Sequence, residues 1–115
     1  MKQTKVKTYT AQIWVGLKDK DNNNLHIIDE VRSLLQHYVD EYSYCVTLTK
    51  TSFFYKDGDE EGFFVGLINY PRFPSTNIQI RQHALRIAKI LKKQLGQKRV
   101  SIVFPDETIM LGELT

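Results

Sequence analysis

The chain has 115 residues, of which 42% are hydrophobic and 25% charged, and it contains one cysteine. This length supports one domain with a single core, and the composition is that of a folded chain rather than a disordered one. One cysteine excludes an internal disulfide and a multi-cysteine metal site, and no apolar run reaches the roughly 18–20 residues that cross a bilayer. We therefore expect a cytoplasmic protein with no membrane partner.

The first part of the chain predicts a flexible arm, a strand and a helix. Residues 1–8 are basic and are expected to fray, which leaves one domain over 9–115. Apolar residues alternate over 9–17 and predict a strand with one buried face. Over 27–42 they recur at helical spacing and predict an amphipathic helix.

The middle of the chain predicts a hairpin. Residues 43–56 are rich in Thr, Tyr, Phe and Val, which favour strands. The sequence DGDEEG over 57–62 is typical of a turn. Residues 63–70 are apolar on both faces, so they predict a strand inside the sheet.

The last part of the chain predicts a second helix and two strands. An apolar stripe runs over 77–96, and Gly96 suits the end of that helix. Residues 99–104 predict a strand, and 108–114 a short final strand after the turn at Pro105.

These elements follow one another as β-α-β-β-α-β with a short extra C-terminal strand. Right-handed crossovers then place two helices on one face of an antiparallel sheet, the α+β ferredoxin-like arrangement. In order and size the chain resembles ferredoxin-like domains, including PII- and CutA-type proteins. The residues also resemble those of small accessory proteins of tailed phages. No signature motif of these families is present, so no functional residue is assigned from them.

The stretch NYPRFPSTN over 69–77 joins the last hairpin strand to the second helix. Its two prolines stiffen the corner, and the helix N-terminus beside Arg72 suits an anion. We therefore expect an anionic small molecule there, plausibly a nucleotide. The alternative is a structural corner that binds only water. The candidate ligand-binding residues are Tyr70, Arg72, Phe73, Ser75, Thr76 and Asn77.

Two further surfaces offer alternative functions. Two helices cover only one sheet face, so apolar side chains on the other predict self-association or a protein partner. The candidate interface residues are Trp14, Phe53 and Phe63. Seven bases and no acid lie within residues 76–105 of a chain with net charge +3, a pattern compatible with nucleic acid. The candidate nucleic-acid contacts are Arg86, Lys89, Lys92 and Lys93.

Catalytic and metal-binding motifs are missing from the sequence. His26 and His37 lie eleven residues apart and are better explained as surface groups than as metal ligands. Cys45 has no histidine near it in the sequence, and Ser75 is better explained as a helix cap. The sequence therefore predicts a small, oligomeric, non-catalytic binding protein without a cofactor or metal.

Overall fold

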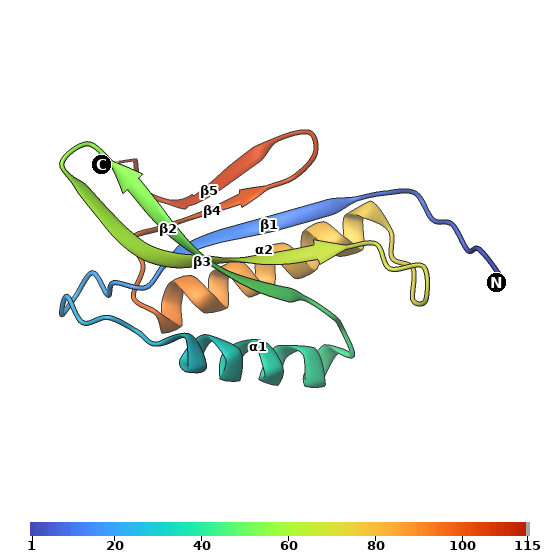
Figure 1. The fold of residues 1–115 in the computed structure, drawn as a ribbon, viewed down its shortest axis with the longest axis horizontal. Helices are drawn as coiled ribbons and strands as arrows, with labels where there is room; N and C mark the ends of the chain where they lie inside the picture. The colour runs from blue at the N-terminus through green and yellow to red at the C-terminus, as the bar shows by residue number, and fades with distance from the viewer. Residues whose placement is uncertain (115) are drawn as a thin grey trace.

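A computed structural model describes residues 1–114, which form one antiparallel sheet of five strands and two helices. The element order is β1 (Thr10–Gly16), α1 (Ile28–Tyr42), β2 (Thr47–Tyr55), β3 (Gly58–Ile68), α2 (Asn77–Gln94), β4 (Arg99–Val103) and β5 (Thr108–Gly112). Thr115, the last residue of the predicted domain, lies outside the described residues. The strands are ordered β2-β3-β1-β4-β5, with both helices on one side of the sheet (Figure 1). The predicted α+β arrangement is confirmed.

The core lies between the sheet and the helices. On β1, Ala11, Ile13 and Val15 are at most 1% exposed, as the alternation of apolar residues predicted. The facing helix α2 contributes Ile80, Ala84, Ile87, Ala88 and Leu91, which are equally buried. Among the described residues, neither helix is long and apolar enough to span a bilayer.

Hydrogen bonds at both ends of α2 explain its boundaries. Thr76 is the N-cap: its Oγ1 accepts from the Gln79 N–H, and its own backbone N–H donates to Gln79 Oε1, which together form a capping box. At the other end Gly96 has φ +58°, its N–H donates to Lys93 O, and the Gln97 N–H donates to Lys92 O. This pair of bonds is a Schellman motif, and it sets where Gln97 leaves the helix.

Three sequence predictions need correction. The second strand begins at Thr47 rather than residue 43, because Ser43 takes a left-handed conformation that ends α1. Of the acid-rich segment 57–62 only Asp57 lies in the turn, because β3 already begins at Gly58, where it pairs with Tyr55. Phe63 is not on the open sheet face, since it is 0% exposed in the core.

Candidate functional site

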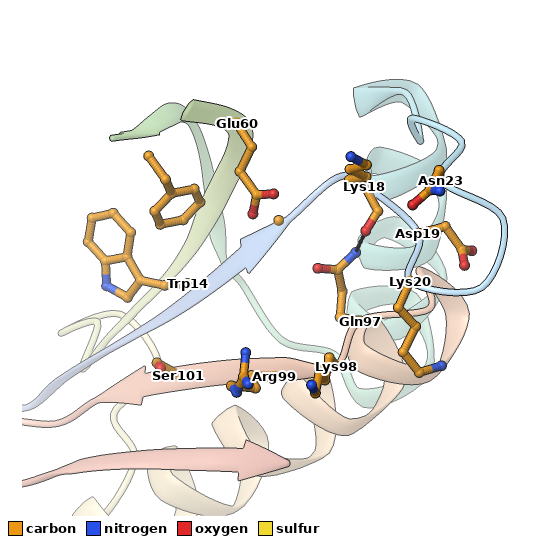
Figure 2. Close-up of a pocket in the computed structure, with 12 residues that line it drawn as sticks. Trp14, Lys18, Asp19, Lys20, Asn23, Glu60, Gln97, Lys98, Arg99 and Ser101 are labelled. Carbon is orange, nitrogen blue, oxygen red and sulfur yellow. Dashed lines mark hydrogen bonds between the residues drawn. The ribbon is translucent and has the colours of Figure 1, made fainter. Parts of the chain in front are cut away.

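A hollow of about 370 Å³ opens on the sheet face that the helices leave uncovered. Its floor comes from residues that alternate outward along neighbouring strands: Trp14 and Gly16 on β1, Phe53 on β2, and Glu60 on β3. Ser101 and Arg99 of β4 extend it, and the loop after β1 forms one wall. Figure 2 shows these side chains around the end of β1. We call this hollow the open-face pocket.

Two acceptor oxygens converge above Gly16. A Cβ added at Gly16 would lie 2.8 Å from Glu60 Oε1 and 3.0 Å from Gln97 Oε1. The missing side chain therefore leaves room for a carboxylate and a carboxamide to approach the same point of the backbone. Because both atoms accept hydrogen bonds, the partner that suits this point is a donor or a cation.

The orientation of Gln97 is set by the protein. Its Nε2 donates to Lys18 O at 2.9 Å and to Leu95 O at 3.0 Å, so the amide nitrogen is occupied. The side chain is only 7% exposed, which leaves Oε1 as the atom turned toward Gly16. The Schellman turn at Gly96 places Gln97 beside the loop after β1, which accounts for these bonds.

Aromatic rings line the pocket next to this acceptor pair. Trp14 lies 4.5 Å from the Phe64 ring and 6.2 Å from the Phe53 ring, measured between centroids. Gly62 makes room for Phe53, since a Cβ at Gly62 would lie 2.3 Å from that ring. A planar base can contact such a surface through its face.

Cationic side chains complete the pocket on the β4 side. Lys98 and Arg99 line it there, and Lys18 and Lys20 line it from the loop. The guanidinium of Arg99 is held by backbone carbonyl groups that follow β5: its Nε donates to Glu113 O at 2.6 Å, and its Nη2 donates to Leu114 O at 3.2 Å. The pocket thus offers an aromatic surface, an acceptor pair and a cationic edge in one place.

The stretch 69–77 forms a tight corner away from this pocket. Tyr70 and Phe73 lie 5.2 Å apart between ring centroids, and the Ser75 N–H donates to Asn69 Oδ1 at 2.8 Å. Thr76 caps α2, Asn77 is its first residue, and Arg72 is exposed. None of these residues lines the open-face pocket.

The other predicted surfaces are placed as follows. Trp14 and Phe53 lie on the open sheet face, where Phe64 rather than Phe63 is their neighbour. Lys89, Lys92 and Lys93 line a separate hollow beside Lys20 and Leu111. The Arg86 guanidinium lies 5.4 Å from the Tyr42 ring centroid. Within residues 1–114, no group of three or more His, Cys, Asp or Glu side chains is arranged to hold a metal ion.

The sequence interpretation missed Glu60, Gln97 and Gly16. One signal was available, because glycines inside strand patterns, here Gly16 and Gly62, often mark a close approach to the backbone. Glu60 was assigned to a turn, and nothing in the local sequence indicated that Gln97 would meet it. Their meeting depends on the order of the strands and on the end of α2.

Comparison with known proteins identifies the fold. No protein-family model and no curated protein sequence matches the chain. A phage SAM lyase in complex with S-methyl-5'-thioadenosine superposes with a TM-score of 0.78 and 13% sequence identity, covering 98% of this chain and 95% of that chain. A phage SAM lyase in the apo state superposes with a TM-score of 0.68 and 14% identity, covering 93% of this chain and 90% of that chain. At these identities the likeness establishes the fold.

The comparison corrects the function predicted from the sequence. The prediction of a non-catalytic binding protein is contradicted, because both structural neighbours are lyases and therefore enzymes. Both are phage proteins, which agrees with the resemblance to phage proteins. The resemblance to PII- and CutA-type proteins is limited to the arrangement of strands and helices. The chain has the same small α+β fold as a phage SAM lyase.

Proposed function

We propose that this chain is a lyase that cleaves S-adenosylmethionine (SAM) and releases S-methyl-5'-thioadenosine (MTA). The observation that carries the proposal is the convergence of Glu60 and Gln97 above Gly16, beside an aromatic surface. SAM has a planar base, two positive centres and one carboxylate. The fold, which the chain has in common with a SAM lyase, supports the same reading.

Each part of SAM has a counterpart in the open-face pocket. The adenine ring lies against Trp14 and Phe53. The acceptor pair, Glu60 and Gln97, takes a positive centre of the methionine end, which the neutral thioether of MTA lacks. Lys98 or Arg99 pairs with the carboxylate. The pocket volume of about 370 Å³ lies within the range for small-molecule sites.

The reaction balances without water. The bond between sulfur and the γ-carbon of the methionine chain breaks, and its electron pair goes to sulfur, which becomes the neutral thioether of MTA. The carboxylate of the same substrate supplies an electron pair to the γ-carbon and closes a lactone. The protein's part is to hold the methionine chain folded, with the carboxylate near that carbon, so that the attack is intramolecular.

Glu60 is assigned to substrate capture rather than to bond cleavage. The sulfonium loses its positive charge as the carbon–sulfur bond breaks, so a nearby carboxylate stabilises SAM more than the transition state. Such a group lowers KM and favours release of the neutral product. Acceleration of the bond cleavage then comes from the positioning of the substrate's methionine chain.

The test is incubation of the purified protein with SAM, with MTA followed by liquid chromatography and mass spectrometry. Wild type is expected to form MTA and an equal amount of the four-carbon remainder. Glu60→Gln is expected to raise KM, while Glu61→Gln is the matched control, because Glu61 accepts a bond from Ser52 outside the pocket. Absence of MTA from a folded wild-type protein would refute the activity.

Self-association is part of the same proposal. The pocket lies on the uncovered sheet face beside the exposed edge of an aromatic cluster, where a second copy of the chain would exclude water from a bound substrate. We also place the protein in the cytoplasm, where SAM is made. Native mass spectrometry with and without MTA reports subunit number, and a monomer under both conditions would rule out this arrangement.

A further inference from the structure

The loop between β1 and α1 is a wall of the open-face pocket. Lys18, Asp19, Lys20 and Asn23 of this loop line the pocket. The Asp19 N–H donates to Asn24 O and the Asn23 N–H to Asp19 O, each at 2.9 Å, so the loop is folded on itself. Its position relative to the sheet depends on contacts at its two sides.

One side of the loop is attached to the end of α2. The Lys20 N–H donates to Gly96 O at 2.8 Å, and Gln97 Nε2 donates to Lys18 O at 2.9 Å. Asp19 lies against Gly96, where an added Cβ would be 2.5 Å from the carboxylate atoms. A carboxylate beside the C-terminal end of a helix is disfavoured by the helix dipole. Asp19 therefore needs a compensating donor or cation.

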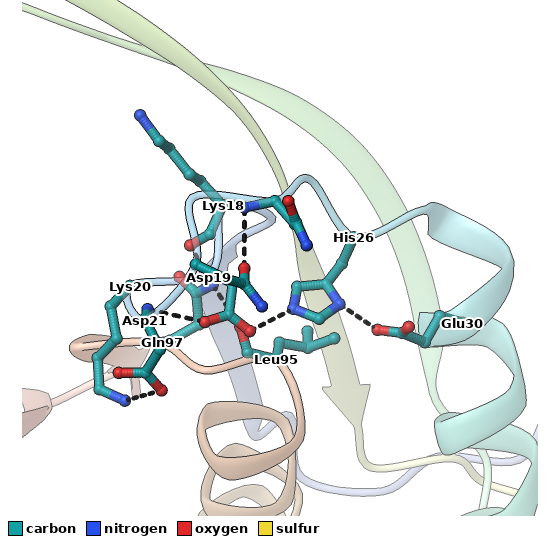
Figure 3. A network of polar contacts seen from close by, with 10 residues as sticks. Lys18, Asp19, Lys20, Asp21, His26, Glu30, Leu95 and Gln97 are labelled. Carbon is teal, nitrogen blue, oxygen red and sulfur yellow. Dashed lines mark hydrogen bonds and ion pairs between the residues drawn. The ribbon is translucent and has the colours of Figure 1, made fainter.

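The Asp21 N–H donates to Asp19 Oδ1 at 2.9 Å, and His26 supplies the remaining compensation and joins the loop to α1. Its Nε2 lies 2.9 Å from Asp19 Oδ2, and its Nδ1 lies 2.5 Å from Glu30 Oε2 (Figure 3). Only the imidazolium form donates from both ring nitrogens. A neutral imidazole keeps one of the two contacts and turns a lone pair toward the other carboxylate. The two-sided contact therefore requires the proton.

We propose that His26 is a positioning residue: when protonated between Asp19 and Glu30, it holds the loop 18–24 in place as a wall of the open-face pocket. The pocket binds its ligand more weakly once that proton is lost. The proposal rests on the proposed function only in the choice of ligand for the test. The contacts themselves are independent of it.

The surroundings of His26 determine the direction of the pH dependence. The hydrogen bond that His26 donates to Asp19 raises the pKa of His26, and Glu30 raises it further, while partial burial lowers it. The loop also carries Lys18, Lys20 and Asp21. The residues at the end of α2 that bond to it, Leu95 to Gln97, are uncharged, but Lys89, Lys92 and Lys93 of α2 share a hollow with Lys20. On the sheet side, Lys50 and Glu61 line a hollow beside Ile27 and Ile28.

We call the contact of protonated His26 with Asp19 and Glu30 the clamp. It consequently has an upper and a lower pH limit. Because the pKa of His26 is raised, its contribution is complete below the ordinary value near 6.5 and is lost as the pH rises through the folded value. The backbone N–H of Asp21 and the bond from His26 lower the pKa of Asp19, so its contribution is lost only in acid, below about pH 4.

The experiment measures the Kd of MTA by calorimetry between about pH 6 and about pH 8.5, a range in which lysines keep their charge. Wild type is expected to lose about fivefold in affinity across the range, the lower end of typical coupling between linked sites. His26→Gln is expected to bind weakly with a flat profile. His37→Gln is the control, since His37 is 85% exposed and contacts only Glu41 at 4.0 Å. A flat wild-type profile, or a wild-type profile in His26→Gln, would overturn the clamp.

A second readout separates failure of the clamp from failure of the proposed function. In a nuclear magnetic resonance titration without ligand, the amide signals of Lys20 and Asp21 are expected to shift with the same midpoint as the His26 ring. If MTA does not bind at any pH but these amides follow His26, the clamp stands and the proposed ligand is wrong. If the amides do not follow His26, the clamp is wrong whether or not MTA binds.

Discussion

Replacing Gln97 with glutamate tests the arrangement that orients the acceptor pair. Gln97→Glu keeps the shape of the side chain but removes both donors, which now bond Lys18 O at 2.9 Å and Leu95 O at 3.0 Å. The introduced carboxylate would face two carbonyl oxygens at a position that is 7% exposed in wild type. An unsatisfied buried polar group costs about 1–3 kcal/mol, so we expect a loss of about 3 kcal/mol for this change.

The size of the effect in a melting experiment follows from the chain length. At about 2.1 cal/mol/K per residue, the unfolding entropy of 115 residues is roughly 0.24 kcal/mol/K, so about 1 kcal/mol corresponds to about 4 °C. The Tm of Gln97→Glu at neutral pH is therefore expected to fall by about 12 °C. In acid the introduced carboxyl becomes protonated and regains one donor, so the difference from wild type should narrow.

The assay is thermal unfolding by circular dichroism over a series of pH values. Gln82→Glu is the matched control, because Gln82 is exposed on α2 and the same change there should leave the Tm within about 2 °C of wild type. An unchanged Tm for Gln97→Glu at neutral pH would show that the amide nitrogen is not held as described. The orientation of Oε1 toward Gly16 would then have no support.

Three further predictions concern the pocket floor, the helix cap and a half-buried histidine. Gly16→Ala should fold, because the atoms nearest to the new Cβ are side-chain ends. It should weaken binding of sinefungin, a SAM analogue that is not cleaved, by filling the space between Glu60 and Gln97; equal affinity in a titration would contradict this. Thr76→Ala removes the N-cap of α2 and should lower stability by about 1 kcal/mol, seen as a fall in Tm of about 4 °C. Thr8→Ala in the N-terminal segment is the control, and equal falls in Tm for the two variants would refute the capping role. His83 Nδ1 lies 2.7 Å from Tyr38 Oη, and burial lowers the pKa of His83. The contribution of neutral His83 to the stability of the fold is therefore present above about pH 6.5 and is lost as the pH falls. The stability difference between wild type and His83→Gln in urea unfolding should accordingly shrink in acid, and a constant difference would contradict the assignment.

The fold was predictable because its elements carry strong periodic patterns. The alternation around Ile13 on β1 and the helical stripe through Ile87 and Leu91 each matched the observed burial. Gly96 was also identified as the end of α2, and it adopts the positive φ that such an end requires. The order of the elements then limited the possible topologies to a few, among them the one observed.

The β2–β3 hairpin was predicted less well, because local composition and tertiary pairing disagree there. Asp59, Glu60 and Glu61 belong to residue types that are depleted in strands. They nevertheless pair with Phe54, Phe53 and Ser52 in a ladder that extends the hairpin. Backbone pairing with β2 therefore outweighs the low strand propensity of these acids.

The candidate site was not predictable from local sequence, because its residues come from separate elements. Gly16, Glu60 and Gln97 are far apart along the chain and meet only because β3 pairs with β1 and α2 ends beside the loop after β1. Sequence analysis instead favoured the stretch 69–77, whose residues are adjacent and easily noticed. In the structure that stretch is a capped corner with Arg72 exposed, and the ligand expected there stays a prediction.

The most direct test of the account compares charged and neutral ligands in the open-face pocket. Calorimetry is performed on wild type and Glu60→Gln with MTA and with sinefungin, an uncleaved analogue that keeps a positive group at the position of the sulfonium. Two opposite charges about 4 Å apart at the edge of a protein interact by about 1–4 kcal/mol. We therefore expect Glu60→Gln to lose about 2 kcal/mol, or roughly 30-fold in Kd, for sinefungin and little for MTA. Equal losses for both ligands, or no binding of either to the wild-type protein, would contradict the assignment of this pocket to SAM.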